Sequence, residues 1–126
     1  MTSATFDPAE LFPARYTLSV DAQKVALASA ALCTYRANTY LMKMLRIMGL
    51  RRQDGKPFEL TDVKEASSEL ESRRLKSRDT NYGWRLIDPL RQDIYREMLK
   101  AGLVAQLPAM IETLDAIQPV TGTHSS

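Results

Sequence analysis

The side chains in this sequence that are best suited to chemistry are basic, and they gather in two clusters. The turn cluster comprises Lys43, Arg46, Arg51, Arg52 and Lys56. The wing cluster comprises Arg73, Arg74, Lys76, Arg78 and Arg85. Cations neutralise nucleic-acid phosphates and release their counterions, so a face that combined both clusters would bind nucleic acid in a salt-dependent way. The competing interpretation is solubilising charge interleaved with acids, because the net charge is only +2.

Groups that could support catalysis or hold a metal are sparse. The sequence has one cysteine, Cys33, and one histidine, His124, so it lacks the ligands of a zinc site and the pairs used in nucleophilic catalysis. The helical spacing around Cys33 favours a small buried hydrophobe. The sequence also lacks a glycine-rich phosphate loop, and its acids are scattered among matching bases. We therefore expect no enzyme activity, no cofactor and no metal.

The length and composition predict one folded domain. The 126 residues are enough to bury a core. Basic residues interrupt the most apolar third, so no run reaches the roughly 20 apolar residues that span a bilayer. The N-terminus has no basic start followed by an apolar stretch, which predicts a cytoplasmic protein. We expect an N-terminal arm at 1–18, the domain at 19–117 and a flexible tail at 118–126.

Apolar residues recur at three- and four-residue steps in three successive segments, which predicts three helices. The first lies within 19–35 and buries Val25, Ala28 and Leu32. The second begins with Asn38 as its N-cap and stops at Gly49. The third is capped by Thr61 and ends near Arg73 or Arg74. A turn rich in glycine and charge separates the second and third helices.

Two short segments that partly alternate apolar and polar residues follow the third helix. Residues 75–78 and 84–87 flank the sequence DTNYG, which predicts a β-hairpin. Asp88 and Pro89 then cap and begin a fourth helix that stops at Gly102. A last helix tolerates Pro108 only within its first turn.

This order of elements is that of a winged helix, a helix-turn-helix with a β-hairpin wing. Tyr40 to Gly102, about half of the chain, resembles the winged-helix modules at the N-terminus of some bacterial helicase-like ATPases of the Swi/Snf type. The shared feature is a similar GL…GKPF turn before the third helix. The predicted fold is therefore mainly α, a winged helix-turn-helix with a two-stranded wing and extra N- and C-terminal helices. The resemblance implies a DNA-binding or interaction module that accompanies an ATPase.

The end of the third helix departs from the family pattern. Winged helices commonly leave this helix through Leu-x-x-x-Gly-Leu, whereas this chain has Arg74 in the place of the glycine. A left-handed arginine costs roughly 1 kcal/mol. Either Arg74 is strained or the helix ends differently.

The third helix is also acidic, which argues against base readout by this helix. Between Thr61 and Ser72 it has a single basic residue, Lys64, against four acids, Asp62, Glu65, Glu69 and Glu71. The residues that read bases best, Arg, Asn and Gln, are absent from this segment. We expect contact with DNA through the wing and the turn, with Lys64, Ser67 and Ser68 as the groove residues and with weak sequence preference. The predicted nucleic-acid-binding residues are Arg51, Arg52, Lys56, Lys64, Ser68, Arg73, Arg74, Lys76, Arg78, Tyr82 and Arg85.

Trp84 and Tyr82 raise a choice between base stacking and packing. Trp84 begins the returning strand, where packing into the core is the expected fate, and Tyr82 is expected at the exposed tip. The hypothesis that follows is a non-catalytic module that binds double-stranded DNA. The alternative is a protein-interaction or dimerisation module on the same fold, with a protein partner or a second copy, which the acidic third helix favours.

Overall fold

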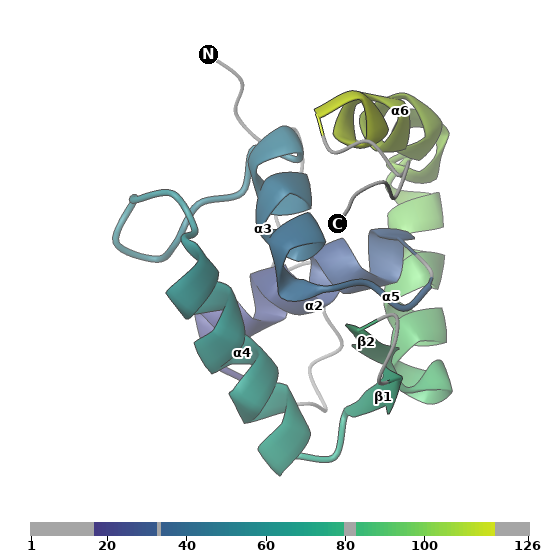
Figure 1. Ribbon diagram of the computed structural model, residues 1–126. Helices are drawn as coiled ribbons and strands as arrows, with labels where there is room; N and C mark the ends of the chain where they lie inside the picture. Colours follow the sequence, from purple (N-terminus) through teal and green to yellow (C-terminus); the bar gives the residue numbers. More distant parts are fainter. Residues whose placement is uncertain (1–16, 33, 80–82, 118–126) are drawn as a thin grey trace.

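The computed structural model describes residues 17–32, 34–79 and 83–117 (Figure 1). It is mainly helical and contains one antiparallel hairpin, so the predicted fold class of a helical domain with a β-hairpin wing is confirmed. The predicted tail and Tyr82, together with nearly all of the predicted arm, lie outside the described residues. The elements, in chain order, are α2 (Val20–Leu32), α3 (Asn38–Ile47), α4 (Leu60–Ser72), β1 (Lys76–Asp79), β2 (Gly83–Leu86), α5 (Asp88–Lys100), the short 3-10 helix η1 (Val104–Gln106) and α6 (Leu107–Ile117).

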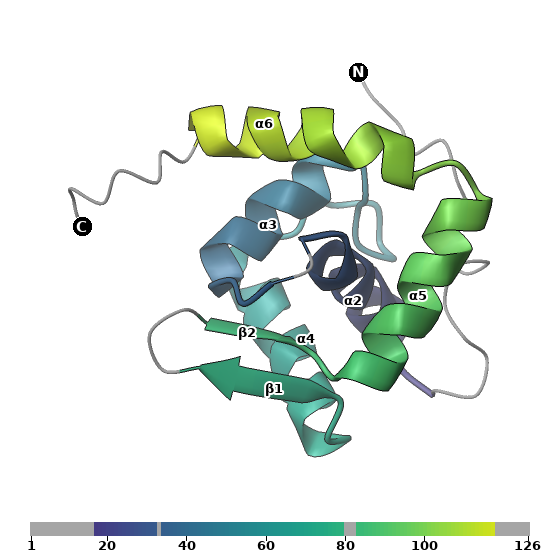
Figure 2. The same cartoon turned by 90° about the vertical axis from the view of Figure 1, so that its right-hand side faces the viewer.

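Helix α2 lies at the centre of the fold, and α3, α4, α5 and β2 all pack on it. Its side chains from Val25 to Leu32 are all buried. Many of them are alanines, and small side chains let neighbouring helices approach closely from several sides at once. Figure 2 shows α2 nearly end-on between α3 and α5, with α6 lying across the top. Burial on all sides explains why Ser29 is the one polar residue of α2 between Val25 and Leu32.

Helices α3, α4 and α5 end in the same way. In each, the first residue after the C-cap has a left-handed backbone. The amide of the next residue donates a hydrogen bond to the carbonyl five residues earlier. This arrangement is the Schellman motif. The left-handed residues are Gly49 (φ 77°), Arg74 (φ 59°) and Gly102 (φ 79°). The closing bonds are Leu50 to Leu45 at 2.9 Å, Leu75 to Leu70 at 2.9 Å and Leu103 to Met98 at 3.0 Å. The sequence left open whether Arg74 is strained or the helix ends differently. The structure shows that α4 ends in the usual way and that the backbone of Arg74 is strained.

The hairpin pairs Lys76 with Leu86 and Arg78 with Trp84. On the other edge of β2, Arg36 and Trp84 exchange two backbone hydrogen bonds, each 3.0 Å long, so the segment between α2 and α3 extends the hairpin. Trp84 is only 4% exposed, which confirms the prediction that it packs in the core. Its indole Nε1 donates to Asn38 Oδ1 at 2.8 Å and ties the wing to the start of α3.

Three predicted helix caps were wrong by one or two residues. The N-cap of α3 is Ala37 rather than Asn38, which is the first residue of the helix. The side chain of Asn38 accepts a hydrogen bond from Trp84 instead of capping the helix. The N-cap of α4 is Glu59 rather than Thr61, and Glu59 and Asp62 form a reciprocal capping box. The N-cap of α5 is Ile87, which leaves Asp88 in the first turn.

Helix α6 completes the fold by packing on α3. Pro108 is its second residue, so the predicted place of this proline in the first turn is confirmed. Leu107 and Leu114 are buried in the common core. Among the described residues, no helix combines the length and the apolar character that crossing a membrane requires.

Candidate nucleic-acid interface

Helix α4 presents a continuous exposed stripe on the side opposite its buried residues. Val63, Ala66 and Leu70 face the core. The exposed stripe consists of Thr61, Lys64, Glu65, Ser68 and Ser72, which recur at steps of three or four residues. Lys64 and Ser68 were predicted from the sequence, whereas Thr61 and Ser72 were missed, although their spacing from Ser68 was visible. The predicted groove residue Ser67 was wrong, because its side chain is buried beneath the wing.

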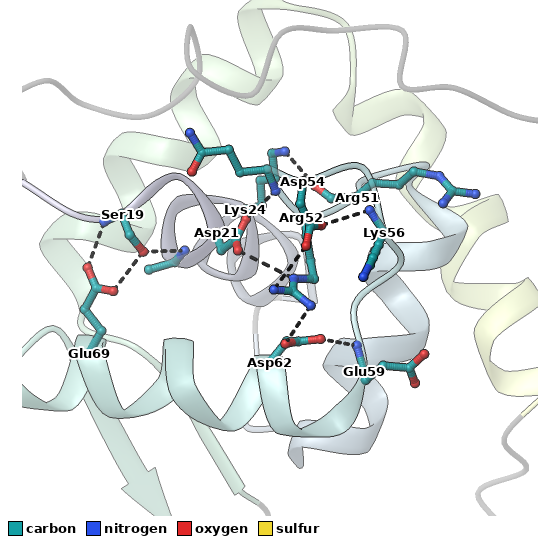
Figure 3. Close-up of polar contacts among 12 residues, drawn as sticks. Ser19, Asp21, Lys24, Arg51, Arg52, Asp54, Lys56, Glu59, Asp62 and Glu69 are labelled. Atoms are coloured by element: carbon teal, nitrogen blue, oxygen red, sulfur yellow. Dashed lines mark hydrogen bonds and ion pairs between the residues drawn. The ribbon is translucent and has the colours of Figure 1, made fainter.

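Arg52, in the turn before α4, is held by three carboxylates (Figure 3). Its guanidinium lies 3.3 Å from Asp62, 3.3 Å from Asp54 and 3.9 Å from Asp21. These acids come from α4, the turn and α2 respectively. Arg52 therefore joins three parts of the fold, and its charge is balanced within the molecule.

The other turn cations are more open. The Arg51 guanidinium donates to the Gly55 carbonyl at 3.1 Å, and Lys56 is exposed. The Lys56 amide donates to the Asp54 carboxylate, and this bond, with the nearby Arg52, holds the pKa of Asp54 below its usual value. Arg46 bridges the Phe58 carbonyl and Glu59, which fixes the turn against α3. Much of the charge in the turn cluster thus serves to shape the turn.

The acids of α4 were expected to repel a phosphate-lined groove, but three of the four are engaged inside the molecule. Asp62 holds Arg52. Glu69 accepts two hydrogen bonds from Ser19, one from its amide and one from its hydroxyl, both 2.8 Å long (Figure 3). Glu71 pairs with the wing. These acids connect α4 to its neighbours, but only Asp62 and Glu71 lie beside cations, so the repulsion predicted from a count of charges is offset only in part.

Lys76 is the most enclosed cation of the wing cluster. Its side chain is only 7% exposed, with Nζ 5.2 Å from the centre of the Trp84 ring and 3.6 Å from Glu71 Oε1. The ammonium also donates to the hydroxyl of the buried Ser67. Burial lowers the pKa of Lys76, and the charge of Glu71 opposes this effect. Lys76 holds the wing against α4 and is not open to a phosphate.

Arg85 is likewise turned inward. Its guanidinium lies 4.9 Å from the centre of the Tyr35 ring and 3.8 Å from Asp88. Asp88 also accepts a bond from Arg91, and this contact is the main reason that the pKa of Asp88 is lowered.

Arg73, Arg74 and Arg78 are exposed. Arg78 pairs with Glu71, but Arg73 and Arg74 have no carboxylate partner within the described part of the chain. Tyr82, the remaining predicted wing residue, falls between the described segments.

The two basic clusters lie at opposite ends of α4. Figure 1 shows the turn at one end of this helix and the hairpin at the other. A helix of 13 residues is about 20 Å long, because each residue adds about 1.5 Å. The fold therefore does not merge the clusters into one patch. It places them on either side of the exposed stripe of α4.

A polar hollow of about 120 Å³ lies between α2 and α4 and is lined by Ser19, Asp21, Arg52, Asp62, Glu65, Ala66 and Glu69. Pockets for drug-sized ligands usually measure about 300 to 1,000 Å³. Within residues 17–32, 34–79 and 83–117, no group of three or more acidic, histidine or cysteine side chains is placed to hold a metal ion.

Comparisons of the chain with protein-family models, with curated proteins and with solved structures gave no match. The class that the fold defines is a helical domain with a β-hairpin.

Proposed function

We propose that this protein is a non-catalytic, cytoplasmic module that binds nucleic acid, preferably double-stranded DNA, with little sequence specificity. The contacts come from the exposed stripe of α4 and from the cations that follow it. The proposal rests on the helix-turn-helix formed by α3 and α4, with the hairpin in the place of a wing, which is the arrangement of winged-helix DNA-binding domains.

One observation carries the proposal. The exposed stripe of α4, in which three small hydroxyl residues lie beside Lys64 and Glu65, leads directly to Arg73 and Arg74. Both arginines are exposed and lack a carboxylate partner among the described residues. Small side chains permit close approach to a duplex, and cations at the end of the helix would contact its phosphates.

The strained backbone of Arg74 supports the same proposal. The Schellman ends of α3 and α5 use glycine at the left-handed position, whereas α4 uses arginine at φ 59°. Strain of this kind tends to persist at functional sites, where the side chain is needed for another reason. A phosphate contact is such a reason.

Weak sequence preference follows from the chemistry of the stripe. Its two charged residues, Lys64 and Glu65, have opposite signs, and the other three are Ser or Thr, which bond to any base edge or to phosphate. The stripe contains no Arg, Asn or Gln, the residues whose two-pronged contacts discriminate guanine and adenine best.

A salt titration of a fluorescently labelled duplex tests the proposal. If Lys64, Arg73 and Arg74 each neutralise one phosphate, the logarithm of the affinity should fall with a slope of about −2.7 against the logarithm of salt. Between 50 mM and 200 mM salt this slope corresponds to a loss of about 40-fold. The double variant Arg73→Gln/Arg74→Gln should bind with a slope of about −0.9.

The matched control is Arg96→Gln/Lys100→Gln. It removes the same charge from exposed positions on α5, which packs against α2 and not on the exposed side of α4. We expect the control to bind within about twofold of the unchanged protein. Equal losses from both double variants, or no binding by the unchanged protein at 50 mM salt, would refute the proposal.

A second candidate function is protein interaction or self-association. It is favoured by the acids of α4, and Leu99 on α5, which is 62% exposed, is an apolar surface residue at which self-association can be tested. Sedimentation of the unchanged protein and of Leu99→Glu tests this candidate. A dimer that the substitution dissociates would favour it over DNA binding, and a monomer at all concentrations would exclude self-association through this residue.

A further inference from the structure

The carboxylate of Glu71 bridges two cations of the wing. Its Oε1 lies 3.6 Å from Lys76 Nζ, and its Oε2 lies 3.4 Å from Arg78 Nη1. The two cations are two residues apart on β1, so both project from the same face of the strand. A nucleic-acid phosphate presents oxygens and negative charge in a similar way to a carboxylate.

The two cations differ in how freely they can move. Lys76 is 7% exposed and is held by the Ser67 hydroxyl and the Trp84 ring as well as by Glu71. Arg78 is 71% exposed, and Glu71 is the one acid that it contacts within the described residues. An ion pair this exposed contributes little to stability, because water screens it, so removing the carboxylate would free Arg78 at little cost to the fold.

We propose that Glu71 occupies the position of a backbone phosphate on the wing and so acts as an internal competitor for Arg78. This inference rests on the proposed nucleic-acid binding. In the free protein, Glu71 holds Arg78 against α4. While Glu71 keeps this place, Arg78 adds no contact to those of Lys64, Arg73 and Arg74, and a phosphate of the duplex can take Arg78 only once the carboxylate is removed. Glu71 therefore lowers the affinity, both by holding Arg78 and by repelling the incoming phosphate.

The substitution Glu71→Gln tests this role, and Glu65→Gln is its matched control. Glu65 is exposed on the same helix and makes no ion pair with any described residue, so its substitution removes an equal charge without releasing a cation. With the labelled duplex at 50 mM salt, Glu71→Gln should raise the affinity roughly fivefold more than Glu65→Gln does. It should also steepen the salt slope by about 0.9, the contribution of one further phosphate.

The double variant Glu71→Gln/Arg78→Gln tests whether the gain in affinity comes from the release of Arg78. In the Arg78→Gln background, Glu71→Gln should gain no more than Glu65→Gln does, because the competitor then has nothing to release. Thermal melting of each variant establishes that it is folded. If Glu71→Gln is unfolded, Arg78→Gln alone decides the matter, since it should weaken binding much less than Arg74→Gln does.

Each outcome has a distinct meaning. If the unchanged protein binds and Glu71→Gln behaves like Glu65→Gln, the competitor role is wrong while the proposed function stands. The same conclusion follows if Arg78→Gln alone weakens binding as much as Arg74→Gln. If neither the unchanged protein nor Glu71→Gln binds the duplex at 50 mM salt, both proposals are wrong.

Discussion

Arg74 stands where the other two Schellman helix ends have glycine, and replacing it should stabilise the fold. A left-handed conformation costs a residue with a side chain about 1–2 kcal/mol. Glycine removes this cost but loses about 0.4–1 kcal/mol through the greater freedom of the unfolded chain. With φ at 59°, Arg74→Gly should therefore raise the free energy of unfolding by about 0.5–1 kcal/mol.

Urea denaturation followed by fluorescence measures this change. Trp84 is the single tryptophan of the chain and is buried, so its emission reports unfolding directly. The denaturation midpoint should rise while the slope of the transition stays constant.

Two controls isolate the backbone effect. Arg73→Gly removes the same charge from the neighbouring position, where φ is −96°, so it should be neutral or destabilising. Gly102→Ala makes the reverse change at φ 79°, where an added Cβ would meet no atom within 4 Å, and should destabilise by about 1 kcal/mol. The reasoning is refuted if Arg74→Gly is no more stable than Arg73→Gly. Under the proposed function, the more stable Arg74→Gly should also bind the duplex more weakly.

Three further predictions concern the wing. Gly83→Ala should lower the free energy of unfolding by more than about 2 kcal/mol, because the added Cβ would lie 2.2 Å from the Arg36 carbonyl oxygen and φ is 104°. An unchanged thermal midpoint would contradict this. Trp84→Phe should lower the free energy of unfolding by about 1–3 kcal/mol, since it removes the hydrogen-bond donor of the Asn38 side chain. In a double-mutant cycle with Asn38→Ala, measured by denaturant unfolding, the two losses should not add. Burial lowers the pKa of Lys76 below 10.5, so in the alkaline range under that value the unfolded chain binds more protons than the folded one, and stability should rise with pH. Lys76→Met should lack this rise, and parallel pH–stability curves for the two proteins would refute the assignment.

The helices and the hairpin could be predicted from the sequence because their signals are local. The spacing of apolar residues located α2 to α6. Glycine marks the left-handed positions 49 and 102, and Arg74 stands where winged helices commonly have glycine. The caps were less predictable. Asn38 is a good N-cap by residue type, but the indole of Trp84, 46 residues away, binds its side chain instead.

The candidate interface could be predicted only in part. The exposed stripe of α4 follows from helical periodicity, whereas Lys64 and Ser68 were predicted together with the buried Ser67 as the groove residues of an acidic helix. The state of each charge did not follow from the sequence, since the prediction treated Arg52, Lys76 and Arg85 as open cations. All three have acidic partners, and the side chain of Lys76 is only 7% exposed.

The sequence by itself determined which segments become helix or hairpin and which of them carry the positive charges, because these properties depend on residues a few positions apart. Only the tertiary structure decided which charges face solvent. The Glu69 carboxylate binds Ser19, 50 residues away, and Arg52 reaches Asp21 across the fold. Such pairs form because α4 and the turn before it pack against α2, so burial and distance, rather than residue type, leave Arg73 and Arg74 open to a partner.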